Sequence, residues 1–130
     1  MEEKKPLRRI LVVDDDPHHN RIAGDLLRHA GYEVEIAWNS AEAVKKAFDF
    51  RPDLVLLDIM MPRWTGHSAC AALRGVNPDL PIVVVSAKAA PEDVKEGLGW
   101  GATRYVTKPF DPDELLRIVK ELLGSVPSGT

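Results

Sequence analysis

The chain has 130 residues, of which 45% are hydrophobic and 28% are charged, so its length and composition fit one domain and exclude two stacked domains. Its formal net charge of -3 is the wrong sign for a protein dedicated to the phosphate backbone of nucleic acid, and its single cysteine, Cys70, excludes an intramolecular disulfide. The longest apolar run, Ala69–Leu73, is far shorter than the roughly 20 residues of a membrane span, so we expect a soluble, cytoplasmic protein with neither membrane nor nucleic acid as a direct partner.

The first predicted strand is Ile10–Val13, whose apolarity is continuous, as in a strand that is buried on both faces of a parallel sheet. A helix follows it: Asp16 is expected to be the N-cap, Pro17 the first helical residue, and Gly31 the left-handed residue after the helix. The second strand, Tyr32–Ala37, alternates between apolar and polar residues, which is typical of a half-exposed edge strand.

The middle of the chain predicts two further helices around a second buried strand. With Ser40 as its cap, a helix is expected to run to about Phe50, because the following Pro52 stops it. The continuous apolar run Leu54–Leu57 predicts the third strand, and the next helix is expected to follow Gly66.

The last third of the chain predicts two more strands and two more helices. Ile82–Val85 is a continuous apolar run, and a helix is expected after Pro91–Asp93. Thr103–Val106 is short and mixed, as in a second edge strand, and the last helix is expected from Asp111 to Leu123. Strand and helix therefore alternate five times, which predicts an α/β fold.

The pattern of apolarity also predicts the order of the strands. The first, third and fourth strands are expected at the centre and the other two at the edges, so right-handed crossovers favour the order 2-1-3-4-5 in a doubly wound parallel sheet. Ligands of such sheets bind beyond the carboxyl ends of the strands, where the winding reverses between strands one and three. The place of a functional site is therefore predicted before any motif is considered.

Polar residues follow four of the strands and are expected to meet at this edge. They are Asp14 and Asp15 after the first strand, Asp58 after the third, Ser86 after the fourth and Lys108 after the fifth. Because neighbouring strands lie about 4.8 Å apart, the carboxylates are expected within several ångströms of one another. Their repulsion would raise a pKa or destabilise the fold, and a divalent cation such as Mg²⁺ would relieve it.

Each residue has a simpler explanation when it is taken alone. Asp16, next to the cluster, is better explained as a helix cap. Asp58 would form a turn, Ser86 would be a turn hydroxyl, and Lys108 would be a solvated lysine. Their joint placement at the carboxyl ends of neighbouring strands favours a functional cluster instead.

Four motifs occur in order along the chain: ILVVDDDP, LVLLDIMMP, VVVSA and YVTKPF. In this order and spacing, they resemble the receiver domain of two-component response regulators over about residues 8 to 123. The resemblance implies a flavodoxin-like (βα)5 fold and a receiver domain at 8–123. Residues 1–7 are then expected to be an N-terminal tail and 124–130 a C-terminal tail or the start of a linker, the chain being either a complete regulator or the front of a longer one.

The resemblance implies a phosphorylation-activated signalling switch with Asp58 as the phosphoacceptor. The donor would be a sensor histidine kinase or a histidine phosphotransfer protein. Ser86 would hydrogen-bond the phosphoryl group and Lys108 would pair with it. A carboxylate can attack phosphorus to form an acyl phosphate, and the transfer needs mainly positioning and neutralisation of charge. Beyond accepting this group and hydrolysing it slowly, the chain is not expected to be an enzyme.

The resemblance also implies a Mg²⁺ site, which Mn²⁺ could fill as well. Asp15, Asp58 and the main-chain carbonyl of Met60 would ligate the ion, and Asp14 would assist through water. Such a site suits Mg²⁺, which binds one or two carboxylates together with waters and phosphate oxygens.

A switch needs an element that responds to the added charge. The resemblance implies that Ser86 and Tyr105 form it, the alternative being a tyrosine that is merely packed on an edge strand. The fourth helix, fifth strand and fifth helix would contact a downstream protein target, a fused output domain absent from this chain, or a second copy in a phosphorylation-dependent homodimer. The first helix, with His18, His19 and Ile22, is the expected contact for the kinase.

The resemblance implies that two positions set the lifetime of the phosphoryl group, Met60 and Lys88, which lie two residues beyond Asp58 and Ser86. The hypothesis is that the apolar Met60 side chain fails to orient a hydrolytic water and so gives a persistent phosphorylated state. Most peptide bonds before proline are trans, and the resemblance raises the frequency of the cis form before Pro109 above that base rate but leaves the isomer open.

Three other functions fit parts of the pattern. A haloacid-dehalogenase-like phosphatase would also use an aspartyl phosphate and Mg²⁺, but Pro17 interrupts its opening motif and the chain lacks room for a substrate cap. A flavin carrier would need a phosphate-binding loop, which three consecutive aspartates after the first strand would disfavour. A phosphorylation-independent interaction module with the same fold is disfavoured by the intact set of acids, hydroxyl and lysine.

Overall fold

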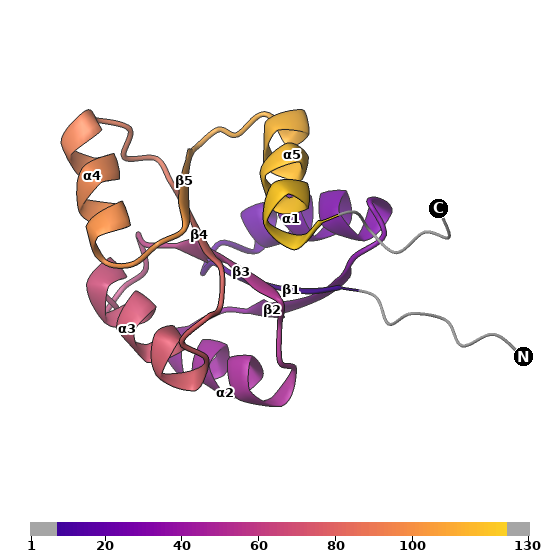
Figure 1. Cartoon of the computed structure of the whole chain (residues 1–130), viewed down its shortest axis with the longest axis horizontal. Helices are drawn as coiled ribbons and strands as arrows, with labels where there is room; N and C mark the ends of the chain where they lie inside the picture. Colours follow the sequence, from indigo (N-terminus) through magenta and orange to yellow (C-terminus); the bar gives the residue numbers. More distant parts are fainter. Residues whose placement is uncertain (1–7, 125–130) are drawn as a thin grey trace, which may run out of the picture.

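The computed structural model describes residues 8–124, in which strands and helices alternate along the chain (Figure 1). The strands are β1 (Arg9–Val13), β2 (Glu33–Ala37), β3 (Leu54–Asp58), β4 (Ile82–Ser86) and β5 (Arg104–Thr107). The helices are α1 (Pro17–His29), α2 (Ser40–Asp49), α3 (Gly66–Val76), α4 (Pro91–Gly99) and α5 (Pro112–Leu123). The tails expected at 1–7 and 124–130 fall outside the described residues, except for Gly124.

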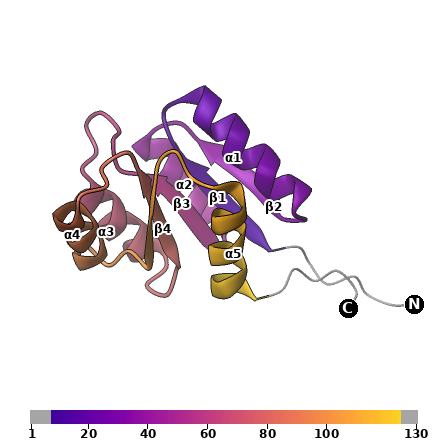
Figure 2. The ribbon, with the colours of Figure 1, turned by 90° about the horizontal axis from the view of Figure 1, so that it is seen from above.

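The strands form one parallel sheet in the order β2-β1-β3-β4-β5, which confirms the predicted topology. In Figure 1, α1 and α5 lie on one side of the sheet and α2 and α3 on the other, while α4 lies near the β5 edge. The turned view in Figure 2 shows the same arrangement from above. The carboxyl ends of all five strands therefore point to one edge of the sheet, as a parallel sheet requires.

Two hydrophobic cores, one on each face, explain why the central strands are apolar without interruption. Along β1, Ile10 and Val12 belong to the core under α1 and α5, whereas Leu11 and Val13 belong to the core under α2 and α3. Successive side chains of a strand point to opposite faces, so a strand covered on both sides needs apolar residues at every position. Full burial of each such side chain contributes about 1.5–3 kcal/mol. Cys70 is a buried free thiol of the second core.

The caps of the helices agree with the sequence predictions except at α2. Asp16 caps α1, its Oδ1 accepting from the main-chain N–H of His18 at 2.9 Å. The cap of α2 is Asn39 rather than the predicted Ser40, because the Oδ1 atom of Asn39 accepts from the Glu42 N–H at 2.8 Å. Both residue types cap helices well, so composition alone placed the boundary one residue too late.

Two helices begin slightly earlier than predicted. The third begins at Gly66 itself, with the Thr65 hydroxyl capping it, and the fourth begins at Pro91 rather than after it. Gly66 also permits a close approach between α3 and the end of α4. A Cβ atom there would lie 2.3 Å from the ring of Trp100, so the indole occupies the space that a side chain would need.

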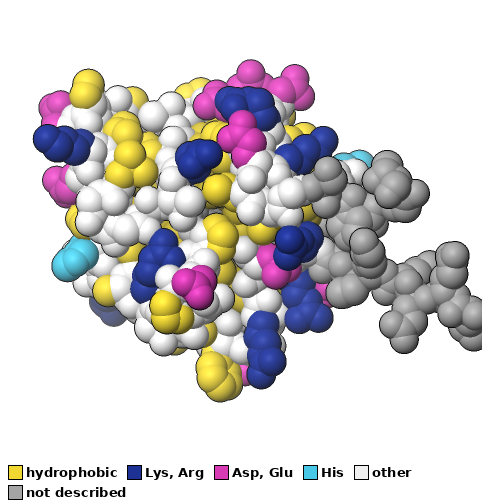
Figure 3. Space-filling model, in the orientation of Figure 1, with side chains coloured by type: hydrophobic (Ala, Val, Ile, Leu, Met, Phe, Trp, Pro, Cys, Tyr) yellow, Lys and Arg dark blue, Asp and Glu magenta, His cyan; other side chains and the backbone are white. Residues whose placement is uncertain are grey.

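The beginning of β1 and the end of α5 lie side by side (Figures 1 and 2), and the Arg8 guanidinium donates to the Leu123 carbonyl at 2.9 Å. Within residues 8–124, no helix is long and apolar enough to cross a membrane. On the face shown in Figure 3, Lys and Arg side chains alternate with acidic and apolar ones and form no broad basic surface, in line with the net charge of -3.

Candidate functional site

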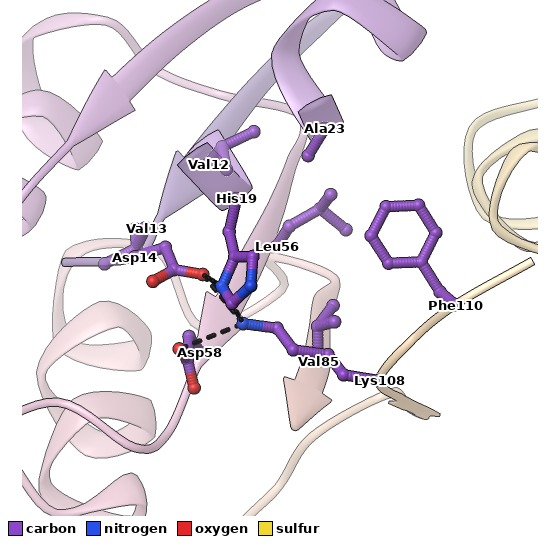
Figure 4. Close-up of a pocket in the computed structure, with 10 residues that line it drawn as sticks. All are labelled: Val12, Val13, Asp14, His19, Ala23, Leu56, Asp58, Val85, Lys108 and Phe110. Carbon is purple, nitrogen blue, oxygen red and sulfur yellow. Dashed lines mark hydrogen bonds and ion pairs between the residues drawn. The ribbon is translucent and has the colours of Figure 1, made fainter. Parts of the chain in front are cut away.

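The fold brings the predicted polar residues to the carboxyl edge of the sheet. Asp14 directly follows β1, Asp58 ends β3, Ser86 ends β4 and Lys108 directly follows β5. In the register of the sheet, Asp58 lies opposite Val85, one residue before Ser86. Figure 4 shows the Lys108 side chain extending toward Asp14 and Asp58, which come from the two neighbouring central strands.

The Lys108 ammonium forms the centre of the cluster. Its Nζ atom lies 2.9 Å from Oδ2 of Asp14 and 3.2 Å from Oδ2 of Asp58. The lysine side chain is 15% exposed, and the two carboxylates are more deeply buried. The peptide bond between Lys108 and Pro109, whose isomer the sequence left open, is cis.

Hydrogen bonds hold both the main chain and the side chain of Asp14 in place. Its Oδ1 atom accepts from the Asp16 N–H at 2.9 Å, and its own N–H donates to the Ala37 carbonyl. The Asn20 amide, fully buried on α1, donates to the Asp14 carbonyl at 2.7 Å. Asn20 was not predicted from the sequence, although its position about one helical turn after the Asp16 cap was a signal of proximity.

Asp58 combines burial with a neighbouring negative charge. Its Oδ1 atom accepts from the Met60 N–H at 2.8 Å, while Oδ2 accepts from Lys108. Burial, together with the charge of Asp14, raises the pKa of Asp58, and these effects outweigh the hydrogen bond from Met60 and the charge of Lys108, which lower it. In the protein alone, the positive charge of Lys108 therefore does not fully compensate the burial of Asp58 and the charge of Asp14.

Lys108 shows the complementary shift. Burial by itself would lower the pKa of its ammonium, but the hydrogen bond to Asp14 and the charges of Asp58 and Asp14 outweigh burial and raise the pKa. The lysine is therefore held in its charged form between the two acids.

Three carboxylates form a group with the chemistry of a metal site. One oxygen each from Asp14, Asp15 and Asp58 lies within 4.8 Å of the others, with Asp15 exposed and the other two buried. Hard oxygen ligands of this kind suit Mg²⁺ and Mn²⁺, and the raised pKa of Asp58 indicates that a further cation would be favourable. The residues present therefore fit a divalent cation.

Ser86 ends the strand that pairs with the one carrying Asp58, and Lys88 links Ser86 to Tyr105. The fully buried Ser86 hydroxyl accepts from the Lys88 N–H at 3.1 Å, and the Tyr105 hydroxyl donates to the Lys88 carbonyl at 2.7 Å. Among residues 8–124, neither hydroxyl is hydrogen-bonded to Asp58 or Lys108. The Tyr105 ring packs against Gly97 of α4, where a Cβ atom would lie 2.8 Å from two ring carbons.

His19 belongs to the cluster, whereas the sequence placed it only in the helix expected to contact the kinase. Its Nδ1 atom lies 3.0 Å from the Lys108 Nζ and 3.5 Å from oxygens of Asp14 and Asp16. It also lines a small cavity of about 20 Å³ beside the aromatic ring of Phe110 (Figure 4). The i,i+3 spacing from the Asp16 cap was a signal, but the contact itself depends on Lys108, 89 residues away.

The chain is similar in sequence to a known protein family and to curated proteins. The sequence model described as "Response regulator receiver domain" matches residues 10–120. The response regulator MprA of Mycobacterium tuberculosis is 43% identical over 115 residues, covering 88% of this chain and 50% of that protein. The DNA-binding response regulator MtrA of Mycolicibacterium smegmatis is 41% identical over 116 residues, covering 89% and 50%. The chain thus spans about half the length of these curated relatives.

Solved structures show the same similarity. The chemotaxis protein CheY4 of Vibrio cholerae matches with a TM-score of 0.84 and 34% identity, covering 90% of this chain and 99% of that one. The receiver domain of a sensor histidine kinase from Pseudomonas aeruginosa, solved with a magnesium ion coordinated in its active-site cleft, matches with a TM-score of 0.82 and 32% identity. That match covers 91% of this chain and 98% of the other.

Proposed function

The chain belongs to the receiver domains of two-component response regulators, and on that basis we propose that it accepts a phosphoryl group on Asp58. One observation carries the proposal. The Asp58 carboxylate lies 3.2 Å from the Lys108 ammonium and shares one edge of the sheet with Asp14 and Asp15, within reach of a single cation. A nucleophile and the positive charge that phosphoryl transfer needs are therefore side by side.

In the proposed step, an oxygen of the Asp58 carboxylate attacks phosphorus and forms an acyl phosphate. The bond between phosphorus and the nitrogen of a phosphohistidine donor breaks, and the imidazole leaves with the electron pair and takes a proton from solvent. Lys108 neutralises charge on the transferred group, since its ammonium already faces the Asp58 oxygen. Within the described residues, the Ser86 hydroxyl donates no hydrogen bond to Asp14 or Asp58. It would therefore donate its hydrogen to the phosphoryl group.

The proposal includes a Mg²⁺ ion, with Mn²⁺ as a substitute. Asp15, Asp58 and the Met60 carbonyl would hold it directly, and Asp14 would do so through water. When bound, the ion would supply positive charge to the oxygens of the transferred phosphoryl group. The three carboxylates support this because their mutual distances match one shared cation and their charge exceeds what Lys108 alone supplies.

Signalling is proposed to leave the molecule through α4, β5 and α5. Tyr105 supports this role because it lies on β5, packs on Gly97 of α4, and connects to Ser86 through Lys88. The proposed recipients are a downstream protein, an output domain joined to the chain, or a second copy bound after phosphorylation. The donor is proposed to be a sensor histidine kinase or a histidine phosphotransfer protein, and α1, where Ile22 is 45% exposed, is proposed to contact it.

Slow hydrolysis of the acyl phosphate would reset the switch, and no other catalytic activity is proposed for this signalling domain. A cytoplasmic location forms part of the proposal, since the single cysteine, Cys70, is a free buried thiol, which suits a reducing compartment.

Incubation with acetyl phosphate and Mg²⁺, followed by mass spectrometry, tests the proposal. The parent protein is expected to gain the mass of one phosphoryl group, and Asp58→Asn is expected to gain none. Asp25→Asn, which changes an exposed acid on α1, is the matched control and should label like the parent. Equal labelling of Asp58→Asn would contradict the assignment, and repeated turnover of phosphate esters would favour a phosphatase.

A further inference from the structure

The Lys108 ammonium has three N–H donors, and the structure provides three acceptors for them. Two are the carboxylate oxygens Oδ2 of Asp14 and Oδ2 of Asp58, at 2.9 and 3.2 Å from Nζ. The third is Nδ1 of His19 at 3.0 Å, which is closer than the Asp58 oxygen. Figure 4 shows the three groups converging on the end of the lysine side chain. The position of the ammonium is therefore determined by a histidine as well as by the two acids.

The chemistry of the contact defines the form of the histidine. A lysine ammonium donates hydrogen bonds and accepts none, so the His19 Nδ1 atom in this contact must be the acceptor. The ring is then neutral, with its hydrogen on Nε2. A neutral acceptor holds the ammonium without adding a third negative charge to the buried cluster.

The place of His19 in the fold makes this contact specific to one side chain. Asp16 caps α1, and the first turn of the helix carries His19 back over the cap and toward Asp14. The preceding residue, His18, is exposed, and its ring lies 6.3 Å from that of His19. Adjacent histidines of one helix therefore have different environments, and only His19 reaches the cluster.

We propose that His19 is a positioning residue that holds the Lys108 ammonium where it can neutralise charge at Asp58. The proposal rests on the function proposed above for Asp58 and adds a residue to it. Without the imidazole, the ammonium keeps two acceptors and shifts toward the nearer one, Asp14, at the expense of the longer contact to Asp58. The phosphoryl group would then receive less positive charge during transfer.

Three variants separate this role from a structural one. His19→Leu removes the acceptor but keeps an apolar side chain on the helix, and His19→Asn restores an acceptor, because the amide oxygen of Asn lies at about the position of Nδ1. His18→Leu is the matched control on the neighbouring exposed ring. Since the His19 side chain is 43% exposed, all three proteins are expected to fold.

Two measurements are made on each protein. The first follows the Lys108 ammonium by ¹H–¹⁵N nuclear magnetic resonance in the ion-free, unphosphorylated protein, its signal identified by its absence from Lys108→Arg. The second is the rate of phosphorylation by acetyl phosphate with Mg²⁺. We expect His19→Leu to shift or broaden the ammonium signal and to slow phosphorylation roughly three- to tenfold, the effect of one net hydrogen bond. His19→Asn should recover most of both, and His18→Leu should match the parent.

The proposal is overturned if His19→Leu leaves the ammonium signal unchanged, or if His19→Asn changes it as much as His19→Leu does, because the effect would then be steric. The signal is recorded without any phosphodonor, so it decides the role of His19 even if the parent takes up no phosphoryl group. That last outcome would contradict the proposed function of Asp58 instead.

Discussion

The Nζ atom of Lys108 lies 3.2 Å from Oδ2 of Asp58, although 50 residues separate the two along the chain. The same ammonium contacts Asp14, and the side chains of both acids are less than a tenth exposed. Lys108→Ala leaves two buried carboxylates without the ammonium that pairs with both, so we expect the free energy of unfolding to fall by roughly 3 kcal/mol in ion-free buffer. Urea unfolding of parent and variant measures this difference.

Lys45→Ala is the control for that prediction. Lys45 also pairs with an acid, Asp49, at 3.7 Å, but its side chain is 79% exposed. Surface pairs of this kind contribute about 0–1 kcal/mol, so this variant should unfold almost as the parent does. Equal losses in the two variants would show that Lys108 has no special role in the stability of the site.

The raised pKa of Asp58 predicts how stability depends on pH. Because burial and the Asp14 charge raise this pKa in the folded state, the folded protein holds the proton at pH values where the unfolded chain has lost it. Stability is therefore expected to fall as pH rises from the ordinary carboxyl pKa, about 4, through the raised value. Asp58→Asn should lack this decrease and should be more stable than the parent at neutral pH without metal.

Chemical denaturation of both proteins at a series of pH values checks this. The informative quantity is the difference between the two free energies of unfolding, because groups that titrate equally in both proteins cancel. A parent that is more stable than Asp58→Asn at neutral pH would contradict the prediction.

Binding of a divalent metal ion should offset the loss of stability that the repulsion among the three carboxylates causes. Binding to the folded state adds stability by mass action, about 2.7 kcal/mol at a hundredfold excess of Mg²⁺ over its dissociation constant. We expect Mg²⁺ to raise the melting temperature of the parent and chelation to lower it again. Asp15→Asn should lose most of this rise. Without metal, its melting temperature should equal that of the parent, because Asp15 is exposed and does not contact Lys108. Asp25→Asn should keep the full rise.

Met60 is expected to lengthen the life of the phosphorylated state. Its N–H donates to Asp58, the proposed phosphoacceptor, and the residue is 53% exposed, with an apolar side chain that offers no group to orient a water. Met60→Asn places an amide there, so we predict faster loss of phosphate after removal of the donor. Phosphate release is followed in variant and parent side by side, and an unchanged or slower rate in the variant would refute the hypothesis.

Gly97 is expected to be essential for the position of Tyr105. A Cβ atom at Gly97 would lie 2.8 Å from the ring, whereas nothing lies within 4 Å of one at Gly99. Alanine favours helices over glycine by up to about 1 kcal/mol, so Gly99→Ala should leave the protein as stable or stabilise it. Gly97→Ala should instead destabilise it and weaken the bond from the Tyr105 hydroxyl to the Lys88 carbonyl. Urea unfolding and the chemical shifts of the tyrosine ring measure the two effects.

The sheet was predictable because its signals are local. The continuous apolar runs around Ile10, Leu54 and Ile82 reflect burial on both faces, and they were sufficient to place β1, β3 and β4 at the centre. The placement of Asp14, Asp58 and Lys108 then followed from the geometry of parallel strands. The cap of α2 was missed by one residue, because Asn39 and Ser40 are adjacent and both suit a cap.

Other features depend on contacts between distant segments and could not be read from local patterns. His19 joins the cluster only because Lys108 extends across the sheet to it. The close contact of Trp100 with Gly66 joins the ends of two helices that no periodicity relates. The roles of Ser86 and Tyr105 in switching stay predictions.

The hydrogen bond between Arg8 and the carbonyl of Leu123 holds the two ends of the described polypeptide together. In this fold each strand runs toward the edge that carries Asp58 and each helix returns from it. The beginning of β1 and the end of α5 therefore both lie at the opposite edge of the sheet. A protein segment joined to either end would be anchored at this one point. It would sense the state of Asp58 only through the body of the fold, or by reaching around its surface.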